Sequence, residues 1–479
     1  MSGRVTASIL SALALLTALA PAAPAAARPG LDWTPCPGQG VPAGMVCSAV
    51  QVPADWSVPA GRRITLALAR LPVVRGGQRA GTLLVNPGGP GAGIATLRAN
   101  AANFAALRER FDAVMWEPRG SGASWGERGG ARYRDCVATG TSPAFPADQA
   151  EFAALARRNQ ALYQRCRQHD PAVFDHLSSS DHARDLDAVA RALGDTGPRT
   201  VNYLGNSYGG MIGGAYARMF PDRVRTMVLD SGGAGTTSAE EDDRAYYRAV
   251  EDLFARFASW CAGERDCRLH GQDVSRRWRD LVASADAKPI PTRGGQALTG
   301  LDLELQGTKF ANHQDRWAQF ASAIDQARRG DATGFGARPA GGPAPFPNAG
   351  LATQCADGLG LADYQRFQAS VARGKRLSRH FPRNRAAYGA GCAGWPRPAG
   401  TGQRLPADRL PPLLGGASTM ETDQVRHALV QVPGSRLVRV DGTFHGLILN
   451  FGNRCMAGHT LRYLVDRALP PKADTTCPA

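Results

Sequence analysis

The strongest chemical signal in the sequence is a serine between glycines, since residues 205–209 read GNSYG. A short apolar run with strand character at 201–204 precedes it, and a helical pattern begins at Gly209. A G-x-S-x-G turn between a strand and a helix lifts the serine hydroxyl clear of the strand end, and its glycines allow close backbone approach. A hydroxyl is a weak nucleophile until a base removes its proton. We therefore predict that Ser207 is a nucleophile and that another side chain serves as its base.

A histidine in a late loop is the expected base. Residues 441–446 read DGTFHG and follow the strand-like segment SRLVRV at 435–440. In this kind of site the histidine comes later in the chain than the serine, in a loop that follows one of the last strands. The chain has nine histidines, so position rather than residue type selects His445 as the general base.

A glycine-rich loop, NPGGPG at 86–91, directly follows the strand-like run GTLLV. Attack on a carbonyl group creates an oxyanion that needs backbone N–H donors already in place. One expected donor is the N–H of Tyr208, the residue after the nucleophile, and the other comes from the early loop, where we choose Gly89. A phosphate-binding loop is the rival interpretation, but the segment lacks the Lys and Ser/Thr of a P-loop.

The elements that must position these residues alternate between strand and helix. Strands are expected at 64–71, 81–85, 111–116, 201–204 and 224–229, and helices at 181–193 and 209–219. This alternation predicts an α/β fold with a mostly parallel sheet and helices on both faces.

The alternation stops near Gly232 and gives way to helical patterns with Pro/Gly breaks, and sheet-like pattern resumes at 413–414 and 435–440. We predict a mainly helical insertion at 235–400 between two core segments, 28–234 and 401–479. Ligands of parallel sheets bind beyond the carboxyl ends of the strands, so the insertion would lie over the site as a cap.

The N-terminus is typical of a secretory signal peptide. Arg4 precedes an apolar run at 9–20 and small residues at 25–27. We therefore assign residues 1–27 to the signal and expect a secreted protein. Beyond it, no apolar stretch is long enough to span a bilayer.

Ten cysteines, an even number, indicate disulfides in an exported chain. We expect neighbours in sequence to pair: Cys36–Cys47, Cys136–Cys166, Cys261–Cys267, Cys355–Cys392 and Cys455–Cys477. No Cys/His spacing suggests zinc, and we expect neither a metal nor a cofactor.

The formal net charge is +15, and arginines scattered along the chain supply most of it. A positive net charge can indicate a nucleic-acid-binding protein, but the sequence contains no nucleic-acid-binding motif. We therefore expect a peptide or ester substrate and no nucleic-acid partner. The oligomeric state stays open.

Taken together, the motifs resemble those of the secreted tripeptidyl aminopeptidases and proline-iminopeptidase-like α/β-hydrolases of actinobacteria. The matching segments are NPGGPG at 86–91, WEPRGSGAS at 116–124, SSSDHARDLDAV at 178–189, GNSYGG at 205–210 and VPGSRLVRVDGTFHG at 432–446. The resemblance implies an α/β-hydrolase core, a helical cap and release of short peptides from substrate N-termini. Related members are esterases, so a carboxylesterase is the alternative.

Two positions depart from the family's pattern. Glu117 stands where the family has Asp in D-x-R-G-x-G-x-S, and Thr419 stands where the acid loop G-G-x-x-D-x-x-T-P has its Asp. The acid holds the tautomer of the histidine and stabilises the imidazolium. Our first choice is Asp230, at the end of the strand VRTMVLD, because strand ends carry such residues. Asp423 or Glu421 of the altered loop are alternatives, and a third possibility is no acid at all, in a slow enzyme or a binding protein.

An acidic run opens the predicted cap: Glu240, Glu241, Asp242 and Asp243. An aminopeptidase needs such a group to hold the free N-terminus of its substrate. We prefer the simpler interpretation, in which these acids stabilise the start of a helix.

Replacing Ser207 by alanine should abolish turnover and leave the fold intact, because only the nucleophilic hydroxyl is removed. Hydrolysis of p-nitrophenyl acetate and a thermal melt followed by circular dichroism measure the two effects. A folded variant with activity close to the wild type would show that Ser207 is not the nucleophile.

Overall fold

Ten strands form one mixed sheet, in the order β1-β2-β3-β5-β4-β6-β7-β10-β11-β12. In this computed structural model the described residues are 1 and 31–479, without 75, 92, 123, 125–143, 337–349, 397 and 399. The strands of the sheet are β1 (Thr34–Pro35), β2 (Val46–Pro53), β3 (Arg63–Leu71), β4 (Gly81–Asn86), β5 (Phe111–Trp116), β6 (Val201–Asn206), β7 (Val224–Asp230), β10 (Leu414–Ala417), β11 (Arg436–Val440) and β12 (Asp474–Cys477). Pairing is antiparallel from β1 to β5 and parallel from β5 to β12. The predicted mostly parallel sheet is confirmed.

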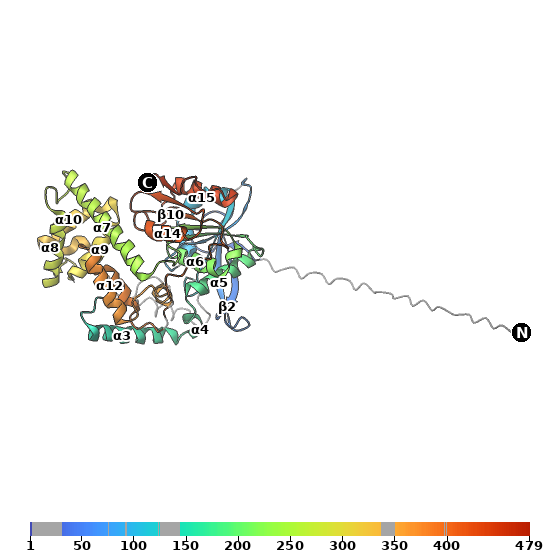
Figure 1. Cartoon of the computed structure of the whole chain (residues 1–479), viewed down its shortest axis with the longest axis horizontal. Coiled ribbons are helices and arrows are strands. Elements are labelled where there is room, and N and C mark those ends of the chain that lie inside the picture. The colour runs from blue at the N-terminus through green and yellow to red at the C-terminus, as the bar shows by residue number, and fades with distance from the viewer. Residues whose placement is uncertain are drawn as a thin grey trace. The chain divides into compact units, whose positions relative to one another are not determined.

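Helices cover both faces of this sheet (Figure 1). The helices of the core are α1 (Gly93–Ala99), α3 (Gln149–Arg167), α4 (Pro171–Phe174), α5 (Ser179–Ala192), α6 (Gly209–Met219), α14 (Thr422–Leu429) and α15 (Arg454–Asp466). Successive side chains of a strand point to opposite faces, and β4 illustrates the result. Leu84 packs in the same cluster as α5 and α6, whereas Leu83 and Val85 pack with α1 and α15.

A second set of helices lies between β7 and β10 in the chain. They are α7 (Ala239–Gly263), α8 (Val274–Ala287), α9 (Gly300–Ala311), α10 (Trp317–Arg328), α11 (Gly350–Ala356), α12 (Tyr364–Leu377) and α13 (Asn384–Gly389). A small hairpin joins α8 to α9 through β8 (Ile290–Pro291) and β9 (Ala297–Leu298). Helices α7 to α10 share a separate aromatic core that includes Phe254, Trp278 and Phe320.

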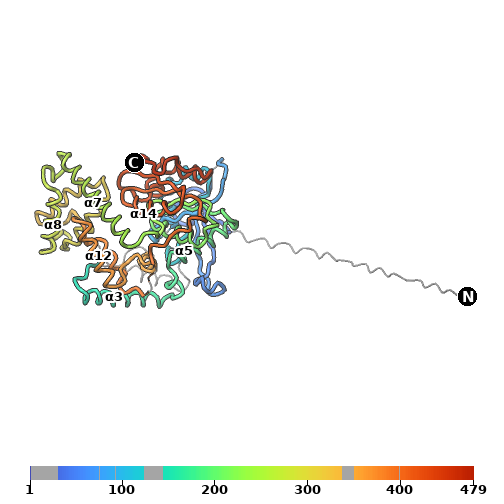
Figure 2. Tube along the Cα trace, in the orientation of Figure 1, coloured from blue at the N-terminus to red at the C-terminus, as the bar shows by residue number. Residues whose placement is uncertain are grey.

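Helix α3 was not anticipated from the sequence. It precedes α5 in the chain, but it lies beside α12 (Figure 2), and the ring of Phe152 of α3 packs at a tilt against that of Phe367 of α12, with ring centroids 5.4 Å apart. A segment that we placed in the first part of the core thus contributes to the packing of the helical region that we expected to be a cap.

Two of the motifs that carried the family resemblance meet in a buried ion pair. Arg119 donates to both oxygens of Asp185, at 2.7 and 2.6 Å, and both side chains are fully buried. Glu117, the first departure from the family pattern, is also buried and accepts hydrogen bonds from the N–H groups of Gly93 and Ile94 at 2.8 and 3.1 Å. A carboxylate at the start of α1 is favourable to the free N–H groups there.

Four of the expected disulfides are present: Cys36–Cys47, Cys261–Cys267, Cys355–Cys392 and Cys455–Cys477. Cys166 is also disulfide-bonded, and its expected partner, Cys136, lies outside the described residues, as does most of the predicted signal at 1–27.

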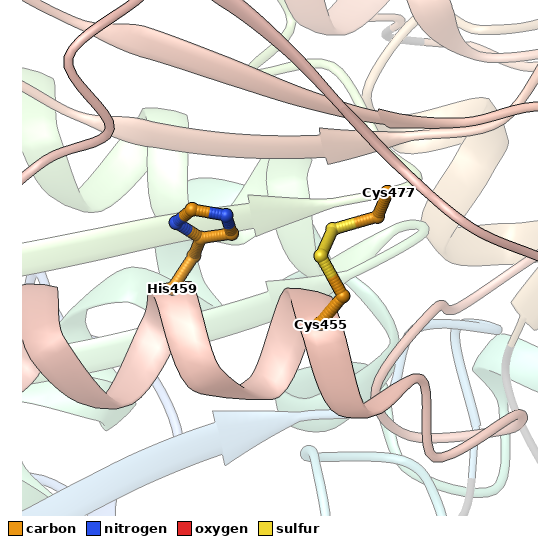
Figure 3. A group of neighbouring side chains, drawn as sticks. All are labelled: Cys455, His459 and Cys477. Carbon is orange, nitrogen blue, oxygen red and sulfur yellow. A yellow bond between two sulfur atoms is a disulfide. The ribbon is translucent and has the colours of Figure 1, made fainter.

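Within the described ranges, one group of side chains is close enough to hold a metal ion: Cys455, His459 and Cys477. The two sulfurs are bonded to each other beside the imidazole (Figure 3), so neither is a thiolate ligand. Over the same part of the chain, we find no helix with the length and apolar character to cross a bilayer.

Candidate active site

Ser207 lies in a sharp turn between β6 and α6. Its φ of 54° is in the left-handed region that side chains rarely adopt, and its N–H donates to the carbonyl oxygen of Asp230 at 2.9 Å. The flanking glycines are required by space, because a Cβ on Gly205 would lie 2.4 Å from the carbonyl oxygen of Gly209. This is the strained strand–turn–helix context that the sequence motif predicts.

His445 follows β11 and lines the same pocket as Ser207. Its Nδ1 lies 2.9 Å from Oε1 of Glu421, and the other oxygen of Glu421 accepts a hydrogen bond from the Ser418 hydroxyl at 2.8 Å. Since Nδ1 faces a carboxylate, it carries the proton, and Nε2 is the nitrogen left to accept the proton of a serine. The hydrogen bond and charge of Glu421 raise the pKa of His445 above its ordinary value, although burial opposes this, and Asp230 adds a smaller contribution.

Asp230, our first choice for the acid, meets different partners. Its side chain is fully buried, and its oxygens accept hydrogen bonds from the N–H groups of Leu447 and Ile448 and from the Ser231 hydroxyl, each at 3.0 Å. The expectation that Asp230 meets the imidazole is therefore corrected: the strand-end carboxylate binds the backbone that follows His445, not the ring. Burial raises the pKa of Asp230, and these hydrogen bonds oppose the rise.

The altered loop explains how Glu421 reaches the ring. Thr419, where the resemblance predicts the acid, donates its N–H to the carbonyl oxygen of Gly442 at 3.3 Å. Glu421 lies two residues later, at the N-cap of α14, and a glutamate is one methylene longer than an aspartate. Asp423, another alternative, is turned toward Arg248, at 2.8 Å.

The glycine-rich loop packs directly against the serine turn. A Cβ on Gly88 would lie 2.5 Å from the carbonyl oxygen of Asn206, and Nδ2 of Asn206 donates to the carbonyl oxygen of Pro87 at 2.7 Å. Gly89 and Tyr208, the two expected oxyanion donors, both line the pocket. The fold thus brings Ser207, His445, Gly89 and Tyr208 together.

The pocket has a volume of about 400 Å³, and its far wall comes from the helical region between β7 and β10. Asp243 of α7 pairs with Arg373 at 2.7 Å and with Arg385 at 3.0 Å. Asp242 instead accepts hydrogen bonds from the Thr237 hydroxyl, at 2.6 Å, and from Gln424, at 3.2 Å. Among the ion pairs of the described residues, none involves Asp242.

The acidic run at the start of α7 therefore has two roles. Glu241 closes a capping box with Ser238, and Glu240 pairs with Arg244 on the surface, as the helix-start interpretation predicts. Asp242 and Asp243 line the pocket, which that interpretation missed. A sequence shows which acids open a helix, but not which of them face a cavity.

Replacing Glu421 by glutamine should lower kcat on the scale of a lost triad acid, about 10⁴-fold, because an amide N–H facing Nδ1 favours the wrong tautomer. Kinetics with p-nitrophenyl acetate measure the loss. Asp423→Asn, on the same helix turn but bound to Arg248, is the matched control and should keep its activity. If the folded glutamine variant kept more than about a tenth of kcat, Glu421 would not be the acid.

Comparison with known proteins agrees with this fold. Residues 81–286 match the family model described as alpha/beta hydrolase fold. The chain is 28% identical to serine protease Hip1 of Mycobacterium tuberculosis, over 92% of this chain and 90% of that protein. It is also 28% identical to the tripeptidyl aminopeptidase of Streptomyces coelicolor, with coverages of 95% and 87%, and to carboxylesterase B of Mycobacterium tuberculosis, with 89% and 85%. The protein therefore has the α/β-hydrolase fold and is a serine hydrolase, similar in sequence to an actinobacterial serine protease and to a tripeptidyl aminopeptidase.

Proposed function

We propose that the protein is an exported serine exopeptidase that releases short peptides, such as tripeptides, from the N-termini of its substrates through an acyl-enzyme. Ser207 is the nucleophile, His445 the general base and Glu421 the acid. The N–H groups of Gly89 and Tyr208 form the oxyanion hole. Residues 235–400 act as the cap that closes the pocket.

The reaction follows from these positions. The Ser207 hydroxyl gives its proton to Nε2 of His445 as its oxygen attacks the substrate carbonyl, and Gly89 and Tyr208 stabilise the resulting oxyanion. The C–N bond then breaks, and His445 returns the proton to the leaving amine. Water, activated by the same imidazole, hydrolyses the acyl-enzyme and releases the short peptide. Glu421 stabilises the imidazolium in both steps.

The observation that carries the exopeptidase assignment is Asp242. The two arginines of the pocket wall are paired with Asp243, so Asp242 is the carboxylate left for a cationic ligand. A free peptide N-terminus is such a ligand, and a partly buried carboxylate would hold it through charge-assisted hydrogen bonds. Burial raises the pKa of Asp242, and Arg385 opposes this rise, so binding of the ammonium group should weaken as the pH falls through the pKa of Asp242.

Two other functions are alternatives. A carboxylesterase would use the same serine and histidine and would not need Asp242, and the likeness to carboxylesterase B keeps this alternative open. A non-catalytic binding protein is the third possibility, because Thr419 stands where an acid is expected. The carboxylate of Glu421 on the imidazole argues against it.

Export is supported by the N-terminal sequence and by the disulfides. Positions 1–27 have the charge, the apolar run and the small residues of a signal peptide. Disulfides form and persist in oxidising compartments, outside the cytosol, and the described part of the chain contains these four: Cys36–Cys47, Cys261–Cys267, Cys355–Cys392 and Cys455–Cys477.

Replacing Asp242 by asparagine should lower kcat/KM for a tripeptidyl p-nitroanilide with a free N-terminus by about tenfold to hundredfold, because a charge-assisted hydrogen bond contributes about 1.5–3 kcal/mol. N-acetylation of the same substrate should cost the wild type a similar factor. Hydrolysis of p-nitrophenyl acetate, which has no ammonium group, should be unchanged.

Glu240→Gln is the matched control, since Glu240 lies on the same helix turn but pairs with Arg244. It should behave like the wild type toward all three substrates. Equal cleavage of free and acetylated peptides, or a preference for esters with no measurable peptide cleavage, would favour the carboxylesterase.

A further inference from the structure

Asp357, directly after α11, is a buried carboxylate that contacts Tyr208, the residue that follows the nucleophile in the sequence. Its side chain is 3% exposed. One oxygen accepts a hydrogen bond from the N–H of Ser179 at 2.8 Å, and the other accepts one from the hydroxyl of Tyr208. Tyr208 is itself 6% exposed, so both partners are buried away from water. In such an interior a hydrogen bond is strong and costly to break.

The same helix reaches the other half of the proposed oxyanion hole. Gln354 of α11 lines the pocket, and its Nε2 makes a long hydrogen bond of 3.5 Å to the carbonyl oxygen of Gly89. Helix α11 and the residue after it therefore contact both residues whose N–H groups we assign to the oxyanion.

A disulfide anchors this helix between the two contacts. Cys355 is bonded to Cys392, at the end of the short helix η6 (Ala390–Cys392). Tyr163 of α3 donates its hydroxyl to the carbonyl oxygen of Gly391 at 2.6 Å and lies 3.9 Å from the Cys355 sulfur. The position of Asp357 is thus fixed relative to the pocket by a covalent link and by packing.

We propose that Asp357 is a positioning residue, which holds the Tyr208 side chain and thereby fixes the direction of the Tyr208 N–H in the oxyanion hole. Tyr208 is the N-cap residue of α6, so its N–H direction depends on how the residue is oriented at this turn. A misplacement of about 1 Å can cost roughly hundredfold in rate. The inference rests on the proposed function, because it takes Tyr208 as an oxyanion donor.

The pKa of Asp357 is consistent with this role. Burial raises it to about 6, while the hydrogen bonds from Tyr208 and Ser179 favour the ionised form. Asp181 adds to the rise, and Arg218 lies near enough to interact with Asp357 by charge.

The test uses Asp357→Asn and Tyr208→Phe, which remove the contact from its two sides. Each should lower kcat for p-nitrophenyl acetate by about tenfold to hundredfold and change KM little. This loss in kcat should not exceed the loss that follows removal of a whole oxyanion donor. Affinity for a peptidyl boronic acid, which forms a tetrahedral adduct on the serine, should fall by a similar factor. The double variant should lose no more than the worse single variant, because both remove one interaction.

Asp170→Asn is the matched control. Asp170 is a buried carboxylate that caps α4 and pairs with Arg62, and it does not line the pocket of Ser207. It should lower the melting temperature and leave kcat and boronate affinity unchanged, which is the behaviour expected of a merely structural carboxylate.

Folded Asp357→Asn or Tyr208→Phe with kcat and boronate affinity within about twofold of the wild type would overturn the proposal, as would additive losses in the double variant. If Asp357→Asn does not fold, Tyr208→Phe decides alone. Failure of the proposed function looks different: the wild type would then cleave free and N-acetylated peptides equally. Failure of this inference instead leaves the preference for free N-termini intact and Asp357→Asn as fast as the wild type.

Discussion

A buried carboxylate without a paired cation must be surrounded by hydrogen-bond donors, because desolvation of its charge is costly. Asp230 meets this requirement with the backbone N–H groups of Leu447 and Ile448. Its own carbonyl oxygen accepts the N–H of Ser207. One residue at the end of β7 thus ties the serine turn to the loop that carries His445, and the relative position of the two depends on it.

With Asp230 committed to the backbone, the charge of the imidazolium needs a different partner. Glu421 supplies it, and the Ser418 hydroxyl fixes the second oxygen of that carboxylate. The two carboxylates have different partners. Asp230, which is fully buried, binds the backbone of the loop, and Glu421, which lines the pocket, meets the imidazole ring. In the proposed site, Glu421 thus takes the place of the acid that the family resemblance predicts at the position of Thr419.

The sequence was sufficient for most of the sheet, but β1, β2 and β12 were not predicted. It was also sufficient for the positions of Ser207 and His445, because each of these residues lies in the turn or loop that follows a predicted strand. It was not sufficient for the acid. Asp230 and Glu421 both lie where a strand of the sheet has ended, near the carboxyl ends of β7 and β10. Only the path of the loop before α14 decides which of the two side chains meets the imidazole. The same limit applies to Asp242, whose place in the pocket depends on how α7 is rotated, and to Asp357, whose partner Tyr208 is 149 residues away.

The most direct test of this account is an NMR titration of the His445 imidazole in the wild type, in Glu421→Gln and in Asp230→Asn. The hydrogen bond of Glu421 is the largest cause of the raised pKa of His445, and the charge of Asp230 is a smaller one. The account predicts that the pKa of His445 falls in Glu421→Gln, and falls further there than in a folded Asp230→Asn. An unchanged pKa in Glu421→Gln, or a larger fall in Asp230→Asn, would contradict it.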